Sequence, residues 1–433
     1  MPMSKKQYYF DYAATTPLDP KVFSAMLPYF KEEFGNPSNL YGLGRNAGRA
    51  IEGATKTITE ILGCRLDEFI YTGSATEADN LAILGVARSQ RASFGTQGSP
   101  LKNFAPKGDP LRPLAPRIIM SQIEHKGILA VCDVLEKEGF GIVRLPVLKN
   151  GLVDLNELKK ELNDRTILVS ITMADSETGT IQPIFEIAKI IKEFCRENAH
   201  LGKFPVFHTD ASQSAGYLDI NVDKLGVDMM TISAHKIYGP KGIGGLYVRK
   251  GTKINPIIYG GGQQGRLRSG TENTPGIVGF AKSLELNSKN KKSEIVRIKK
   301  MRDALEKGIF KSIPKVVLNG HPTNRLPNFL NISILDVEGE AMLLYLDELG
   351  IMVSTGSACN SQNLEPSYIL AALGNSYEHI HGSLRFTLGK KNTMQDIKYV
   401  LKHLSNVVKK LRSISSLDLS LNQKKWQNKI KKM

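Results

Sequence analysis

The stretch Thr166-Ile167-Leu168-Val169-Ser170-Ile171-Thr172-Met173 is a short apolar run of the kind that forms a buried strand. A helical pattern follows at 183–198 and a second apolar run at 204–209. From about residue 66 the chain repeats this alternation, which is typical of a parallel α/β sheet. The runs are rich in Val and Ile without strict alternation, as expected when helices cover both faces of the sheet. The predicted strands are 68–72, 117–121, 141–146, 166–173, 204–209, 228–233 and 244–249, and the helices between them include 77–88, 126–138, 156–162 and 183–198.

Two segments depart from this pattern and suggest how the chain is divided. Residues 89–116 contain five prolines and almost no periodicity, which predicts a flexible surface insertion. After a lysine-rich stretch at 287–292, a long amphipathic helix at 294–310 precedes strands near 316–318 and 329–334 and helices near 339–349 and 393–411. We predict a large domain at 17–290, a smaller α+β domain made of 1–16 and 291–412, and a basic tail at 413–433.

The net charge of +16 is concentrated in two segments. Residues 402–433 carry nine Lys or Arg and one acidic residue, and residues 88–117 carry six and one. A basic tail could bind RNA or an acidic partner through counterion release. A solvated tail that aids solubility is the simpler interpretation.

Length, hydropathy and cysteine use exclude several classes of protein. A chain of 433 residues is long enough for two or three structural units, and no run approaches the roughly 18 apolar residues of a membrane helix. The first residues lack the apolar core of a secretory signal. The four cysteines lie far apart, which excludes a zinc ribbon or a dense disulfide frame. We expect a cytoplasmic enzyme, bacterial by default, although a processed mitochondrial chain would look similar.

A lysine and an aspartate follow two neighbouring predicted strands. Lys236 ends the sequence TISAHK at 231–236, where partial desolvation can keep its amine neutral and able to attack a carbonyl carbon. Ser233 and His235 lie close enough along the chain to bind a phosphate or orient a ring. Asp210 ends the preceding strand, and a buried carboxylate there needs a cation such as a protonated pyridine nitrogen. The alternative is that Asp210 caps the N-terminus of a helix.

Two further strand ends carry candidate ligand-binding groups. The sequence YTGSATEADN at 71–80 reads as a strand, a turn of small residues and a helix start. Its free backbone N–H groups form either a phosphate-binding turn or an ordinary capped helix. His125 follows the strand that ends at Ser121, at the sheet edge where ligands bind. Its imidazole suits ring stacking and proton transfer, although a lone histidine is more often structural.

The C-terminal part contributes a cysteine and an arginine. Cys359 lies in VSTGSACNSQNLEP at 353–366, a predicted exposed loop on which a thiolate can attack an outside atom. Cys64, Cys132 and Cys195 lie in or beside apolar, periodic segments, and we interpret them as packing residues. Arg385 lies on a predicted strand, where its guanidinium could grip a substrate carboxylate or form a structural ion pair.

In this order the segments resemble the cysteine desulfurases of the NifS/IscS type, which are class V pyridoxal-phosphate enzymes of fold-type I. The resemblance includes DYAATTP at 11–17, GNPS at 35–38 and HKIYGPKG at 235–242, and it spans about residues 8–412. The extended loop, with SAC at 357–359 and LEPSY at 364–368, resembles group I of the family. The resemblance to this family implies a mostly parallel sheet in the large domain. It also implies pyridoxal 5'-phosphate as cofactor, no metal, and conversion of L-cysteine to L-alanine with sulfur transfer.

The resemblance also implies roles for individual residues. Lys236 would hold the cofactor covalently and, once released, would remove the substrate α-proton. His125 would stack on the ring and shuttle protons, and Cys359 would take the sulfur as a persulfide. The other assignments are Asp210 to the pyridine nitrogen, Gln213 and Ser176 to the ring oxygen, Ala75, Thr76, Ser233 and His235 to the phosphate, Thr271 to the phosphate of a homodimer partner, and Asn36 and Arg385 to the substrate carboxylate.

The chain departs from the family pattern at 175–177, where it has Asp-Ser-Glu and relatives have Asn-Asn-Glu. Ser176 is shorter than asparagine and would need water to reach the ring oxygen, and Asp175 adds a negative charge. The resemblance implies delivery of sulfur to an iron–sulfur scaffold protein or another acceptor, including tRNA thiolation.

Two alternatives to a cysteine desulfurase stay open. One is a related class V enzyme, either a selenocysteine lyase or an aminotransferase, and the cysteine loop argues against an aminotransferase, which needs no thiol. The other is a colourless basic adaptor that has lost catalysis. The joint presence of Lys236, Asp210, His125, Arg385 and Cys359 argues against the adaptor.

Overall fold

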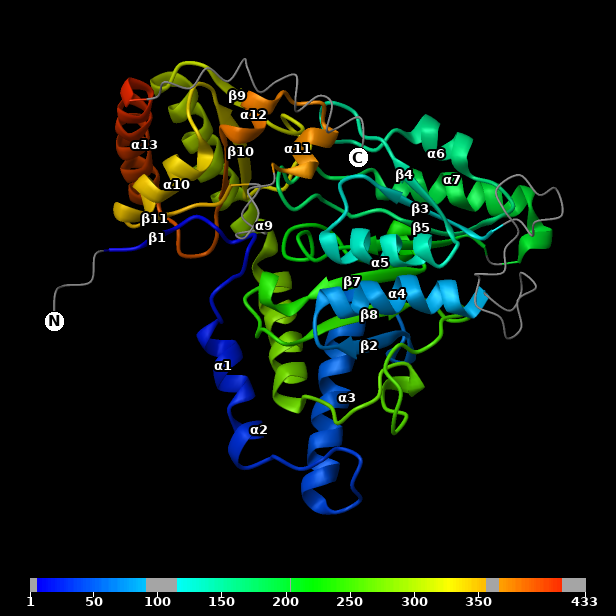
Figure 1. Cartoon of the computed structure of the whole chain (residues 1–433). Helices are drawn as coiled ribbons and strands as arrows, with labels where there is room; N and C mark the ends of the chain where they lie inside the picture. The colour runs from blue at the N-terminus through cyan, green and yellow to red at the C-terminus, as the bar shows by residue number, and fades with distance from the viewer. Residues whose placement is uncertain (1–5, 91–114, 203, 356–365, 415–433) are drawn as a thin grey trace.

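A computed structural model describes residues 6–90, 115–202, 204–355 and 366–414. Its centre is a seven-stranded sheet with the order β2-β8-β7-β6-β5-β3-β4 (Figure 1). The five strands from β7 to β4 in this order run parallel, whereas β8 is antiparallel to both of its neighbours. The strands are β2 (Phe69–Thr72), β3 (Arg117–Ser121), β4 (Gly141–Leu145), β5 (Thr166–Ser170), β6 (Val206–Asp210), β7 (Met229–Ser233) and β8 (Gly244–Val248).

Helices α4 (Ala75–Gln90) and α5 (Lys126–Lys137) cover one face of this sheet. Their apolar side chains form a buried cluster with Ile118, Met120 and Leu168 of the strands beneath them. Every residue of β5, β6, β7 and β8 is buried. This two-sided burial is the reason the strands do not alternate between apolar and polar residues.

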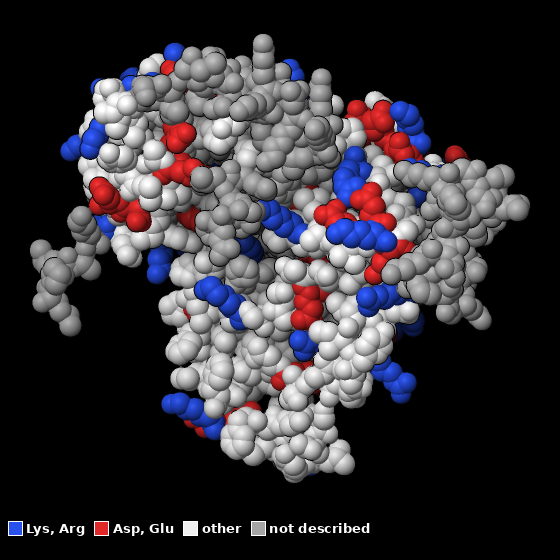
Figure 2. All heavy atoms as spheres, in the orientation of Figure 1, with Lys and Arg blue, Asp and Glu red and all other residues white. Residues whose placement is uncertain are grey.

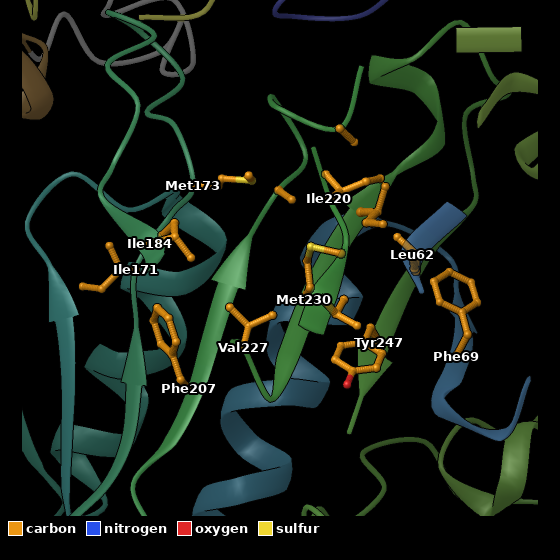
Figure 3. Packing of buried hydrophobic residues seen from close by; sticks show 14 of the residues in the cluster. Leu62, Phe69, Ile171, Met173, Ile184, Phe207, Ile220, Val227, Met230 and Tyr247 are labelled. Carbon is orange, nitrogen blue, oxygen red and sulfur yellow. The ribbon is translucent and has the colours of Figure 1, made fainter. Parts of the chain in front are cut away.

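The opposite face carries α3 (Gly42–Leu62), α7 (Ile184–Glu197) and the first half of α9 (Thr274–Ser312). Figure 3 shows the packing there, where Phe207 of β6 and Tyr247 of β8 lie in the same cluster as residues from these helices. The large sheet therefore forms the middle layer between two layers of helices, as the sequence predicts for an α/β fold.

A second, smaller sheet has the antiparallel order β12-β10-β9 and packs against the second half of α9. Its core also includes Phe10, close to the N-terminus. The elements outside the large sheet and its covering helices are β1 (Tyr8–Tyr9), α1 (Pro20–Met26), α2 (Pro28–Lys31), α6 (Leu155–Glu161), α8 (Val222–Leu225), β9 (Val316–Leu318), β10 (Phe329–Ile334), α10 (Gly339–Glu348), β11 (Ile351–Met352), α11 (Tyr368–Ala372), α12 (Tyr377–His381), β12 (Ser383–Thr387) and α13 (Met394–Ile414).

The predicted helix at 294–310 is the second half of α9, which begins at Thr274 and continues through the lysine-rich stretch. The domain boundary predicted at residue 290 therefore falls inside a helix. Lysine is a good helix former, and Lys289 and Lys292 lie on the exposed side. Most of the predicted insertion and tail, 91–114 and 415–433, lies outside the described residues. No helix in the described ranges is long and apolar enough to cross a bilayer.

Candidate active site

The ends of three strands meet at one edge of the large sheet. Thr72 at the end of β2 and Ser233 at the end of β7 both pair with Gly244, the first residue of β8. β6 runs parallel to β7 and ends at Asp210. Since ligands of α/β sheets bind at the carboxyl ends of parallel strands, the predicted cofactor residues at 75–76, 210–213 and 233–236 come together at this edge.

Lys236 lies in a single helical turn that follows β7 directly. Its Nζ donates hydrogen bonds to the backbone carbonyls of Ala13 (2.5 Å) and Ala14 (2.9 Å). The side-chain amide of Gln213 donates to the same Ala13 carbonyl at 3.1 Å. The N-terminal segment 11–17 therefore brings Lys236 and Gln213 to one point, which is a role that its sequence pattern alone did not reveal.

Asp210 and His125 are both fixed by backbone groups. A carboxylate oxygen of the buried Asp210 accepts a hydrogen bond from the N–H of Ser212 at 2.8 Å. His125 caps α5, and its Nδ1 accepts from the N–H of Gly127 at 3.1 Å, so the proton of the neutral ring lies on Nε2. The side chain of His125 is partly open to solvent, but protein packs closely around its ring. The ring is therefore less hydrated than in water, and this lowers the pKa of His125. Asp210 opposes the effect and the positive charge of Lys236 adds to it.

The first turn of α4 and the end of β7 provide groups suited to a phosphate. The N–H groups at a helix N-terminus have no intrahelical acceptor, and α4 begins at Ala75. The Ser233 hydroxyl is buried and bonds to no described group, which is rare for a buried polar atom. His235 lies beside it in sequence, and its Nδ1 is 3.1 Å from the Thr15 hydroxyl. Burial, together with the charge of neighbouring lysines, lowers the pKa of His235 to about 4, so the ring is neutral at physiological pH.

Thr76 and His125 lie on either side of Gly127. A Cβ added at Gly127 would lie 3.2 Å from both the Thr76 methyl group and His125 Nδ1. The helix turn suited to a phosphate and the histidine suited to stacking are therefore neighbours. Together with the unpartnered Ser233 hydroxyl, this arrangement fits the pyridoxal phosphate that the resemblance implies.

Substituting Gly244 with alanine tests this phosphate turn. A Cβ there would lie 2.7 Å from the carbonyl carbon of Ser74 and 2.9 Å from the amide nitrogen of Ala75, so the backbone of the turn must move. We expect Gly244→Ala to weaken pyridoxal-phosphate binding by roughly tenfold or more, equivalent to about 1.4 kcal/mol. Absorbance titration of the cofactor-free protein measures the change.

The matched control is Gly53→Ala. Gly53 lies on the exposed side of α3 with open space around its Cα. A Gly→Ala change in an exposed helix tends to stabilise the fold, so this variant should bind the cofactor like the wild type. Equal affinities for both variants would show that the turn does not hold the phosphate.

Arg385, on β12, is already engaged by the protein. Its Nη2 donates to Asp11 Oδ1 at 2.7 Å, and its Nη1 donates to the backbone carbonyl of Ser176 at 2.8 Å. Its Nε is buried and has no partner among the described residues. The structural ion pair that the sequence left open exists, and these two bonds use only two of the five N–H donors of the guanidinium.

Asp175, which departs from the family pattern, holds a turn. Its carboxylate accepts hydrogen bonds from the backbone N–H groups of Glu177 (2.9 Å), Thr178 (2.7 Å) and Thr180 (3.0 Å), and also from the Thr178 hydroxyl. Burial raises its pKa. The carboxylate of Asp175 is therefore occupied by the turn, and the neighbouring Ser176 is half-buried beside Arg385.

Glu177 joins this turn to the residues that follow the predicted cysteine loop. Its buried carboxylate accepts a hydrogen bond from the hydroxyl of Ser367, which also caps α11. Burial raises the pKa of Glu177 to about 7, although the Ser367 hydrogen bond and Arg385 oppose the increase. The folded protein therefore keeps a proton on this carboxyl group at pH values where the unfolded chain has lost it.

This difference predicts how stability depends on pH. Between about pH 4.5 and pH 7 the carboxyl group of Glu177 ionises in the unfolded chain but keeps its proton in the folded protein. The free energy of unfolding should therefore fall by on the order of 3 kcal/mol as the pH rises through this range. Glu177→Gln keeps an acceptor for Ser367 and should lack this decrease. Urea unfolding at several pH values measures this decrease.

The control is Glu60→Gln, on the exposed side of α3. An identical pH dependence for wild type and Glu177→Gln would contradict the prediction.

Two buried acids near Asp210 were not singled out from the sequence. Asp79 of α4 is fully buried, neither of its oxygens bonds to a described group, and His208 Nε2 lies 3.8 Å from Oδ1. Burial, with repulsion from Asp210, raises its pKa well above the usual range. Burial also raises the pKa of Glu124 to about 8. The carboxyl group of Glu124 is thus largely protonated at neutral pH. In the sequence, Asp79 could have been noticed as a charged residue on an otherwise apolar face of a predicted helix.

Two predicted site residues are not joined to the others within the chain. Asn36 is exposed, and its side chain accepts a hydrogen bond from the N–H of Ser38 in its own loop. That loop connects α2 to α3 at the lower end of the molecule (Figure 1). Thr271 is exposed. Their assignments, one of which requires a partner subunit, stay predictions.

The cysteines separate into two groups. Cys132 is buried, and Cys64 and Cys195 are half-buried against the core. Loss of hydration raises the pKa of Cys64 and of Cys132 to about 12, which keeps these thiols protonated and confirms them as packing residues. Cys359 lies outside the described residues.

Comparison with known proteins assigns the chain to a family. Residues 8–95 and 113–400 match the family described as aminotransferase class-V. The protein named cysteine desulfurase IscS of Dictyoglomus turgidum is 47% identical over 411 residues, covering 95% of this chain and 97% of the relative. The protein of the same name from Methanosarcina thermophila is 45% identical over 412 residues, covering 95% and 94%.

Solved structures resemble the chain over both sheets. A structure described as a NifS-like protein has a TM-score of 0.82 at 32% identity, covering 94% of this chain and 100% of that one. A structure described as SspA in complex with cysteine has a TM-score of 0.72 at 32% identity, covering 88% and 99%. The second description states that a protein of this fold binds cysteine.

Proposed function

Because this chain belongs to the class-V aminotransferase family and is a cysteine desulfurase, we propose that it moves the sulfur of L-cysteine onto Cys359 as a persulfide. The observation that carries the proposal is the meeting of Lys236, Gln213, Asp210 and the unpartnered Ser233 hydroxyl at one sheet edge. The amine, carboxylate and phosphate-binding groups of a pyridoxal enzyme thus lie at the same edge, and Cys359 would add the thiol that accepts sulfur.

The residues that would hold pyridoxal phosphate follow from this geometry. Ala75 and Thr76 at the start of α4, with Ser233 and His235, would bind the phosphate. Asp210 would pair with the ring nitrogen, Gln213 and Ser176 would face the ring oxygen, and Lys236 would hold the aldehyde carbon. When bound, the cofactor supplies an electron sink for the carbon that loses a proton.

The side chains would then divide the work as follows. Arg385 binds the α-carboxylate of cysteine through N–H donors that its bonds to Asp11 and to the Ser176 carbonyl do not use. Lys236 takes the α-proton as a general base, and His125, neutral with its proton on Nε2, is placed to move protons near the substrate sulfur. The Cys359 thiolate attacks that sulfur, the Cβ–S bond of the substrate breaks with its electron pair left on carbon, and the three-carbon remainder leaves as alanine once Cβ and then Cα are protonated.

A homodimer would complete the site. Large apolar side chains are exposed along α1, α2 and the loop to α3, and contiguous exposed apolar surface marks an interaction site. The lowest part of the surface in Figure 2, over this loop, carries almost no charge. A second copy burying this band would bring Asn36 near the partner and Thr271 towards the partner's phosphate. The exposed residues are Phe23, Leu27, Phe30, Phe34, Leu40 and Tyr41.

The persulfide sulfur would serve iron–sulfur cluster assembly through a scaffold protein, and tRNA thiolation through another acceptor. The basic segment at 402–433 is a candidate contact for an acidic acceptor, and direct RNA binding is the weaker use of it. A cytoplasmic location fits the wide spacing of the four cysteines along the sequence.

The test is a single-turnover assay on the protein loaded with pyridoxal phosphate. L-cysteine and a reductant should yield alanine and sulfide in equal amounts, and the protein should be yellow. A protein that binds the cofactor but releases no alanine would overturn the proposed transfer of sulfur to Cys359. A protein that stays colourless after the cofactor is added would favour the adaptor alternative.

A further inference from the structure

Asp11 is the charged residue of the N-terminal segment that covers the site. The segment 11–17 (DYAATTP) contacts Lys236 through Ala13 and Ala14, while Asp11 contacts Arg385. The Tyr9 hydroxyl lies 2.8 Å from the Asp11 carbonyl oxygen, which helps to hold the segment in place. One short segment therefore touches both the residue proposed as general base and the residue proposed to bind the substrate carboxylate.

The Asp11–Arg385 pair is close and largely shielded from water. The distance from Nη2 to Oδ1 is 2.7 Å, and the exposed fractions of the Arg385 and Asp11 side chains are 10% and 20%. Charge-assisted bonds of this kind are stronger than those of exposed pairs. The substrate carboxylate would thus meet a guanidinium that a carboxylate of the protein already occupies on one side.

Asp11 therefore has two separable effects on Arg385. Together with the Ser176 carbonyl on Nη1, it fixes the plane of the guanidinium, and these two bonds use only two of its five N–H donors. Its negative charge also offsets the positive charge that attracts a substrate carboxylate. The first effect favours substrate binding and the second opposes it.

We propose that Asp11 is a positioning residue that sets the affinity for the α-carboxylate of the amino-acid substrate by orienting Arg385 and partly neutralising it. This inference rests on the proposed role of Arg385. It concerns how tightly an amino-acid carboxylate is held, and the chemistry at sulfur is separate from it.

Two substitutions separate the two effects. Asp11→Asn keeps an oxygen acceptor for Nη2 and removes the charge, so KM for L-cysteine should fall by about threefold to tenfold with little change in kcat. Asp11→Ala removes the acceptor as well, so the guanidinium loses its orientation and KM should rise by about tenfold. Opposite changes in KM are the signature, since a merely structural role would move both variants in the same direction.

Cysteamine, which is cysteine without its carboxylate, is the control probe. Its inhibition constant should be the same for wild type, Asp11→Asn and Asp11→Ala, because it offers nothing to Arg385. Parallel shifts for cysteamine and cysteine, or equal KM values for cysteine in all three proteins, would overturn the inference. Failure of the wild type to convert cysteine would instead overturn the proposed function itself, so the two failures are distinguishable.

Discussion

Lys236→Ala should lower alanine production from L-cysteine by about 10³-fold or more. The substitution removes the amine that would hold the cofactor and take the α-proton, and general base catalysis alone contributes roughly 10²–10⁴-fold. The fold should persist, because the hydrogen bonds of Nζ go to the carbonyls of Ala13 and Ala14, and a typical hydrogen bond contributes only about 1 kcal/mol. Single-turnover alanine release measures the rate, and exhaustive dialysis measures whether the cofactor is still retained.

The control for this prediction is Lys224→Ala. Lys224 is an exposed lysine paired with Asp219 on the surface, and its loss should change neither rate nor colour. A small primary amine added to Lys236→Ala should restore part of the rate, because it supplies the missing base. Retention of more than about a tenth of the wild-type rate by Lys236→Ala would remove this lysine from the mechanism.

The large sheet could be predicted because its signal is local. Each predicted strand between 68 and 249 is present, with ends that differ by no more than three residues from β2 to β8. Short runs of Val and Ile buried on both sides leave a strong mark in the sequence. The strand-end rule then placed Asp210, Ser233 and Lys236 at one edge, as the structure does.

Elements that depend on distant partners could not be predicted. β1 is two residues long and pairs with β11, more than 340 residues away, so neither strand has a local pattern. The helices α1 and α2 expose Phe23 and Phe30, which blurs the apolar periodicity expected of a surface helix. The helix predicted at 294–310 starts too late, because the polar stretch at 287–292 resembles a linker although it lies inside α9.

The same reasoning explains which parts of the site were missed. Asp11 and Arg385 are 374 residues apart, and only the folded chain shows that they form an ion pair. Asp79 is conspicuous only once its burial is known. We propose that the two-domain division still holds, with α9 shared, because Phe10 belongs to the core of the C-terminal unit while Phe280 belongs to the core of the large sheet.

Cys359→Ser should abolish persulfide formation and lower alanine release by at least about 10²-fold while the protein stays yellow. Serine keeps the size of the side chain but its hydroxyl is a far weaker nucleophile than a thiolate. The groups proposed to hold the cofactor, Lys236, Asp210 and Ser233, lie on other segments, so the absorbance of the bound cofactor should not change. Alkylation of the protein after one turnover, followed by mass spectrometry, locates the extra sulfur atom.

Cys64→Ser is the matched control for Cys359. Cys64 is half-buried with a pKa raised to about 12, so its thiolate is scarce at neutral pH and its loss should leave sulfur transfer intact. The pair of variants separates two explanations of any remaining activity. Persulfide found on Cys64 or Cys132 in Cys359→Ser would mean that a packing thiol can reach the substrate. Full alanine release without any persulfide would mean that the added reductant attacks the substrate sulfur directly, and the sulfur-transfer step assigned to Cys359 would be wrong.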